Sequence, residues 1–250
     1  MGRMVLPSII NPQGFLNPIK GGPVLHEIAH EWGNRGLIPS AADFGHWGFS
    51  SAGGQLGGFQ AGTLVQLGGN QWQAKGPATN CTPNNAPGGA FPFNCTPALF
   101  PSTFGTFANR GNSVVYSPLE LFAMGLLPSS AVPDTQVALN ASWVDPSQGI
   151  FSATGMQTIS ASTILAANPT RIPANASGQK HFKVATVVLT PKASLDAATL
   201  TELNETLPGF SADGVPSYGV SNGSIYVHNF YTATRGLATI RAGGLSLEAR

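Results

Sequence analysis

The sequence predicts an α+β protein, and three features point to this class. A short helix is expected from Pro23 to Trp32, because proline suits the first helical position and Gly33 suits the stop. Residues 34–112 contain many glycines and prolines but few long periodic runs, which indicates a loop-rich middle. Strand-like and helix-like runs alternate after about residue 150. We therefore divide the chain into residues 1–150, which also contain the chemical motif analysed below, and a small C-terminal α+β region, residues 151–250.

The middle of the chain offers weaker secondary-structure signals. Short strands are expected at Leu64–Leu67 and Phe104–Phe107, where apolar residues cluster between turn formers. A second helix is expected from Pro118 to Leu126, with Ser117 as its N-cap and Pro128 as its stop.

The C-terminal region has stronger signals. The β-branched run Phe182–Leu189 predicts a strand. A helix is expected over Ser194–Leu207, with Asp196 in its first turn and Pro208-Gly209 ending it. Two further strands are expected, at Ser224–Val227 and Leu237–Ile240.

Charge is sparse in this 250-residue chain. Its 12 basic and 11 acidic residues give a formal net charge of +1, and only 9% of residues are charged against about 25% in typical proteins. This balance argues against a nucleic-acid partner, which would require a basic surface. The sequence contains no run of about 20 apolar residues, so no transmembrane segment is expected. The composition is typical of a loop-rich secreted or extracytoplasmic monomer, although no secretory signal is recognisable after Met1.

The only two cysteines, Cys81 and Cys95, flank the Pro/Gly/Asn-rich segment Thr82–Asn94. A disulfide closing this loop is the simplest interpretation, and two free thiols are the alternative. Because the spacing is not CxxC, a cysteine zinc ribbon or redox pair is excluded.

The strongest motif is HExxH, formed by His26-Glu27-Ile28-Ala29-His30 inside the first expected helix. Residues i and i+4 of a helix share one face, about 6 Å apart along the axis, so two imidazoles can bind one zinc ion. Glu27 projects about 100° away from His26, which suits a general base acting on a water at the zinc. The alternative is an amphipathic helix with two surface histidines.

The segment from His26 to Gly36, HEIAHEWGNRG, resembles the zincin metallopeptidases, whose metzincin branch has HExxHxxGxxH and a Met-turn. The match ends where Gly36 stands in place of the last histidine. The chain is also similar to bacterial secreted zincin-like proteins, through Gly45-His46-Trp47, Ser51–Gly58 and Ser117–Leu126. The resemblance implies a zincin-like α+β fold, a zinc ion and a peptide or protein substrate.

His46 is the candidate third zinc ligand, because His26, His30 and His46 are the only histidines before residue 150. The segment Asn34–Gly45 contains a glycine and a proline and can return the chain to the helix. Glu120 is the alternative, either as a ligand of the gluzincin type or as a residue that holds a ligand histidine.

Other candidates have weaker support. Tyr116 can polarise a substrate carbonyl, and Met124 can form an apolar floor under the metal, although core packing explains both. Asp43 can orient a ligand, whereas Gly53–Gly58 lacks a phosphate-loop ending and is expected to be a flexible rim loop. Three residues are expected to have no role at the site: Glu31, His181 and His228.

These features predict a zinc-dependent peptidase, an endopeptidase rather than an exopeptidase, with Glu27 as general base. The alternative is a non-catalytic zincin-like secreted or surface binding protein. A purely structural zinc site is disfavoured, because such sites need four protein ligands and no cysteine lies near the motif.

Overall fold

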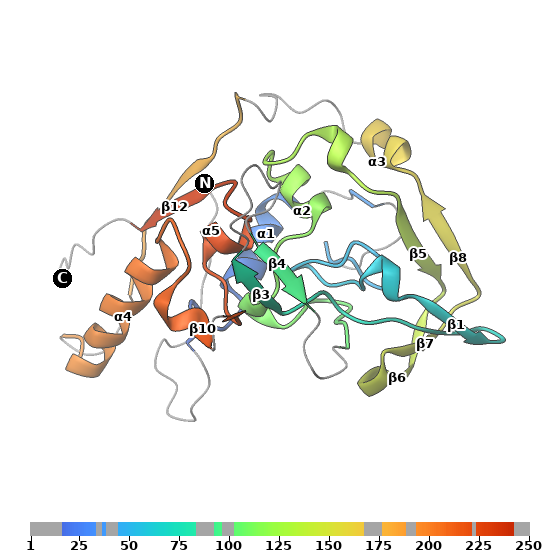
Figure 1. Ribbon diagram of the computed structural model, residues 1–250, viewed down its shortest axis with the longest axis horizontal. Coiled ribbons are helices and arrows are strands. Elements are labelled where there is room, and N and C mark those ends of the chain that lie inside the picture. Colours follow the sequence, from blue (N-terminus) through green and yellow to red (C-terminus); the bar gives the residue numbers. More distant parts are fainter. Residues whose placement is uncertain are drawn as a thin grey trace.

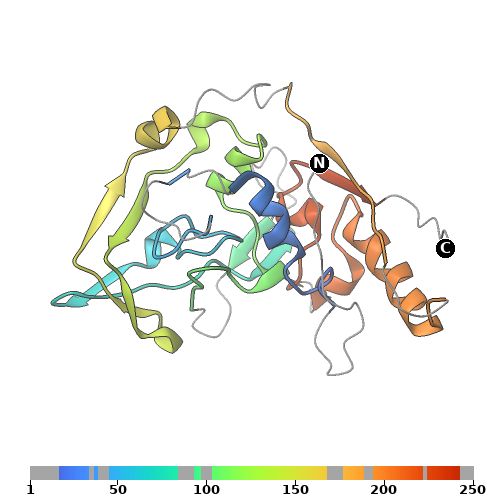
Figure 2. The ribbon, with the colours of Figure 1, turned by 180° about the vertical axis from the view of Figure 1, so that it is seen from behind.

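The computed structural model describes most of the chain (Figures 1 and 2). The described residues are 17–33, 37–38, 45–83, 93–96, 103–167, 177–188, 194–221 and 224–242. In this part of the chain, no helix is long and apolar enough to cross a bilayer.

Helices and strands are mixed along the chain, as expected for an α+β protein. The helices are α1 (Val24–Gly33), α2 (Pro118–Ala123), α3 (Ala161–Ala167), α4 (Ala197–Phe210) and α5 (Phe230–Ala233). The strands are β1 (Val65–Gly68), β2 (Gln71–Gln73), β3 (Asn80–Pro83), β4 (Phe93–Thr96), β5 (Thr135–Leu139), β6 (Ser142–Asp145), β7 (Ile150–Ser152), β8 (Gly155–Ile159), β9 (His181–Val184), β10 (Val220–Ser221), β11 (Ser224–Ile225) and β12 (Thr239–Ala242).

The strands form small sheets rather than one continuous sheet. Two sheets have four strands each, in the orders β1-β2-β7-β6 and β10-β11-β3-β4, and β5 pairs with β8 antiparallel. The pair β9–β12 is parallel, and the chain between its strands contains α4 and α5. Helices α1 and α2 lie centrally, with β1 and β5–β8 on one side and α4 and β12 on the other (Figures 1 and 2).

One large apolar core surrounds the two central helices. It combines Leu25 on α1 and Leu119 on α2 with Phe230 on α5 and Ile240 on β12. The cluster thus draws buried residues from both sides of residue 150. A second cluster contains Phe59, Phe104 and Phe151, among others. Trp72 and Trp143, from the β1-β2-β7-β6 sheet, pack against it.

Local signals located the first two helices well. Helix α1 begins one residue after Pro23, whose carbonyl accepts a hydrogen bond from the Glu27 N–H at 2.9 Å. Ser117 is the N-cap of α2, as expected, and forms a capping box with Glu120. However, α2 ends before Leu126 because Gly125 adopts a φ of 77°, which ends the helix earlier than Pro128 could.

Two expectations were wrong. Residues 104–107 do not form a strand, because the chain turns there and the Gly105 N–H donates to Asn109 Oδ1. Pro208 does not end α4, which continues to Phe210. A proline near a helix end removes only one backbone hydrogen bond, and the burial of Phe210 together with a bond from the Ser211 N–H to the Leu207 carbonyl holds the last turn.

The remaining strand expectations agree in part. Strand β1 lies one residue beyond the expected Leu64–Leu67, and β9 is shorter than the expected Phe182–Leu189, of which residue 189 lies outside the described residues. Strands β11 and β12 overlap the last two expected strands, and Asp196 is the N-cap of α4 rather than part of its first turn.

We predict that Cys81 and Cys95 form a disulfide. Strands β3 and β4 pair antiparallel with these two residues directly opposite each other, which is the backbone placement that a disulfide requires. The short loop implies a stabilisation of roughly 3 kcal/mol. Thiol labelling of the native, non-reduced protein should detect neither cysteine, and quantitative labelling of both would contradict the prediction.

We also predict that acidification destabilises the fold through His228. This side chain is fully buried, and burial, together with the charge of Arg235, lowers its pKa to about 3. Because the pKa in the unfolded chain is about 6.5, the unfolding free energy should decrease below pH 6.5, by up to about 1.4 kcal/mol per pH unit until pH 3. Urea unfolding at several pH values with chelator present measures this slope, and His228→Gln should flatten it.

Candidate metal centre

Helix α1 is fixed in place at its N-terminal end by side chains from the segment before α2. The Leu25 N–H donates to Asn112 Oδ1 at 3.2 Å, and Asn112 Nδ2 donates to the Ile19 carbonyl at 2.7 Å. The buried Tyr116 hydroxyl donates to the Leu25 carbonyl at 2.8 Å. Tyr116 therefore supports the motif helix, and its hydroxyl is engaged by the backbone rather than presented to a substrate.

Three histidine side chains meet beside α1. His26 Nε2 lies 3.0 Å from His30 Nε2 and 3.4 Å from His46 Nε2. One nitrogen from each of the three residues lies within 4.8 Å of the others, and this is the one such group of potential ligands among the described residues. The expected pair on α1 and the expected third histidine thus lie together.

The distances from His26 Nε2 to the other two nitrogens fit a tetrahedral zinc ion. Zinc–nitrogen bonds of about 2.0–2.1 Å at tetrahedral angles place the ligand nitrogens about 3.3 Å apart. The two observed separations bracket this value. His30 and His46 are only partly buried, so solvent reaches two of the three histidines. A fourth ligand position for water or substrate requires such access.

The orientation of His26 is fixed by the backbone. Its Nδ1 lies 2.8 Å from the Gln55 carbonyl oxygen, which can only accept, so Nδ1 carries the proton and Nε2 presents its lone pair to the other histidines. Burial lowers the pKa of His26, and the hydrogen bond to Gln55 opposes this effect only in part. Because burial is the larger effect, the lowered pKa favours the neutral imidazole that a metal needs.

Glu27 is exposed and close enough to His26 to interact with it electrostatically. It is not a member of the group of three histidines. Glu31, one turn further along α1, is also exposed and has no position in the group, as expected.

Glu120 is not a member of this group of potential metal ligands. The side chain is only 2% exposed, and both carboxylate oxygens accept hydrogen bonds from N–H groups. Burial raises the pKa of Glu120, while these hydrogen bonds lower it. The carboxylate accepts hydrogen bonds from Gln55, whose carbonyl contacts His26, and from Trp47, which follows His46 in the sequence.

The weaker candidates lie elsewhere. Met124 is buried in the core that includes Leu119 and Leu121, as core packing predicts. His181 is exposed on β9, and His228 is buried with Nε2 3.6 Å from Cys81 Sγ. Asp43 lies outside the described residues.

The segment Gly53–Gly58 is not the flexible rim loop that its composition predicted. Residues 54–58 are buried, and Gly57 and Gly58 adopt positive φ values of 94° and 82°. A side chain at Gly54 would collide with the Glu120 carboxylate. The segment Ser117-Pro-Leu-Glu120 has the S-x-x-E pattern of a capping box, and this signal identifies Glu120 as a residue that turns back to accept backbone N–H groups.

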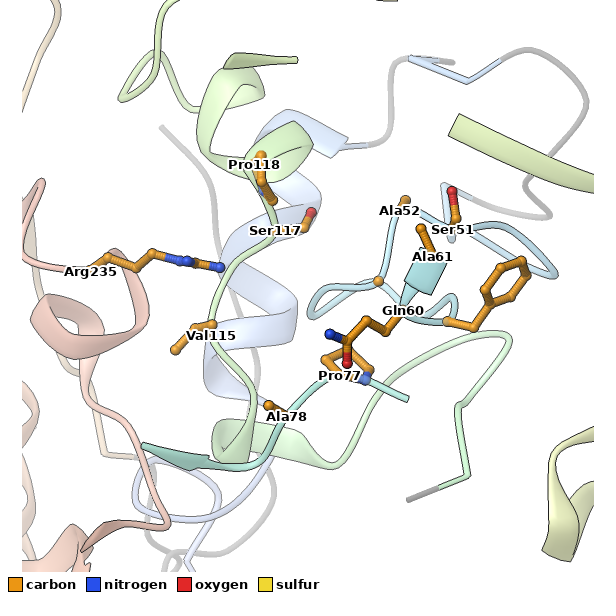
Figure 3. A pocket seen from close by; sticks show the side chains of 12 residues that line it. Ser51, Ala52, Gln60, Ala61, Pro77, Ala78, Val115, Ser117, Pro118 and Arg235 are labelled. Atoms are coloured by element: carbon orange, nitrogen blue, oxygen red, sulfur yellow. The ribbon is translucent and has the colours of Figure 1, made fainter. Parts of the chain in front are cut away.

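A separate pocket of about 350 Å³ lies between the start of α2 and the 51–61 segment (Figure 3). Its walls include Gln60, Pro77 and Ser117, and Arg235 points toward it from the other side (Figure 3). None of the three histidines lines this pocket. The cluster of three histidines is therefore separate from this pocket.

Comparisons with models of known protein families, with curated proteins and with solved structures give no match for this chain.

We predict that His46→Ala weakens zinc binding far more than His181→Ala does. His46 places a nitrogen among those of His26 and His30, whereas the exposed His181 lies outside that group and contacts Thr239 on β12. Titration of each purified variant with zinc against a competing chelator measures the difference. Equal affinities for the two variants would remove His46 from the site.

Proposed function

We propose that this chain is a zinc-dependent peptidase, with His26, His30 and His46 as ligands and Glu27 as general base. The observation that carries the proposal is the convergence of three imidazole nitrogens within 4.8 Å of one another, two of them on the helix that also carries the exposed Glu27. When bound there, zinc would supply a Lewis acid for a substrate carbonyl and would lower the pKa of water.

The residues of the chain perform the remaining steps. His26, held by the Gln55 carbonyl, keeps one tautomer and one ring orientation. Glu27 accepts a proton from the attacking water and can then give it to the departing amine, as general acid–base catalysis of peptide hydrolysis requires. Its side chain is exposed and lies outside the group of three histidines.

Three histidines with an open fourth position favour a catalytic over a closed structural site. The described residues place neither a cysteine nor a carboxylate among the ligand nitrogens. This is the ligand set that leaves room for water or substrate, and it supports hydrolysis over a purely structural role.

We predict that Glu27→Gln binds zinc as the natural protein does but loses peptide hydrolysis by several orders of magnitude. The substitution preserves shape and removes the proton acceptor, while the three ligands remain. Zinc content and cleavage of casein, an unstructured protein substrate, are measured on the same preparations.

The matched control is Glu31→Gln, which makes the same chemical change one turn away on α1, at another exposed position. It should leave both measurements unchanged. A natural protein that binds zinc but cleaves no peptide would favour the non-catalytic binding protein, and one that binds no zinc would refute the proposal.

A further inference from the structure

One buried carboxylate contacts the backbone and side chains that surround two of the three histidines. Glu120 Oε1 accepts hydrogen bonds from Trp47 Nε1 at 2.9 Å and from the Leu56 N–H at 2.7 Å. Its Oε2 accepts from the Gln55 N–H at 3.0 Å and from the Ser117 N–H at 2.8 Å. The four donors use both oxygens fully.

Two of these donors, Gln55 and Trp47, are directly connected to histidines of the cluster. Gln55, whose N–H binds Glu120, offers its carbonyl to His26 Nδ1. Trp47 directly follows His46, and its own backbone N–H donates to the Leu56 carbonyl at 2.8 Å. The positions of His26 and His46 therefore depend on a peptide segment that is hydrogen-bonded to Glu120.

We propose that Glu120 is a positioning residue for the metal centre, acting on His26 through Gln55 and on His46 through Trp47. This inference rests on the proposed metal site. Of the four hydrogen bonds to the Glu120 carboxylate, only the one from the Ser117 N–H belongs to the cap of α2. The other three donors belong to the 47–56 segment beside the histidines. Gly54 has no side chain where one would strike the carboxylate, so this close approach is built into the loop.

The decisive variant is Glu120→Gln. An amide has one acceptor oxygen, so its NH₂ group must face two N–H donors, and one pair of bonds is lost whichever way the side chain turns. Loss of such an outer partner should weaken zinc binding by about 10- to 100-fold. The absorption spectrum of bound Co²⁺, used as a probe of ligand geometry, should also change.

Ser117→Ala is the matched control. It removes the hydroxyl that accepts the Glu120 N–H at 3.3 Å, so it weakens the α2 cap, but it leaves all four bonds to the carboxylate. It should lower the melting temperature while keeping zinc affinity within about twofold and the Co²⁺ spectrum unchanged. A general loss of stability is thereby separated from positioning.

If Glu120→Gln does not fold, Trp47→Phe decides, because it keeps the buried ring and removes a single donor to Glu120. It should weaken zinc binding several-fold and alter the Co²⁺ spectrum. Affinity and spectrum equal to those of Ser117→Ala, in whichever variant folds, would overturn the inference. If the natural protein itself binds neither Zn²⁺ nor Co²⁺, the proposed function fails instead.

Discussion

The buried carboxylate of Glu120 constrains the centre of this molecule. An ion removed from water costs several kcal/mol unless donors replace its hydration, and here four N–H groups do so. Three of them come from the 47–56 segment and one from the start of α2. Neither segment can shift without leaving part of a buried carboxylate unsatisfied, so the two move only together.

This constraint explains the glycines of the middle region better than flexibility does. The backbone turns sharply at Gly53, Gly57 and Gly58, each with a positive φ, and Gly54 lies against Glu120 where a side chain has no room. Such turns allow consecutive N–H groups to face one carboxylate. A glycine-rich sequence thus encodes a buried, hydrogen-bonded loop, although composition alone cannot distinguish it from an exposed one.

Features set by short-range chemistry were predictable. Pro23 and Ser117 marked the starts of α1 and α2 within a residue, and the i, i+4 spacing placed His26 and His30 on one face. The continuation of α4 to Phe210 was not predictable, because core burial outweighs one lost hydrogen bond there. The role of Gln55 was equally hidden, since its carbonyl contact with His26 depends on the tertiary fold.

The position of His46 was only partly predictable from the sequence. The small number of histidines made it a candidate, but its position depends on contacts far away in sequence. The neighbouring Gly48 N–H donates to the Thr106 carbonyl at 3.0 Å, and Trp47 binds both Leu56 and Glu120. In a metal site with two ligands on one helix, the helix geometry alone places that pair. The third ligand must be placed by tertiary contacts. The departure from the zincin pattern at Gly36 is therefore compatible with His46 as the third ligand of the proposed site, because hydrogen bonds of the adjacent Trp47 and Gly48, rather than a fixed sequence spacing, determine where His46 lies.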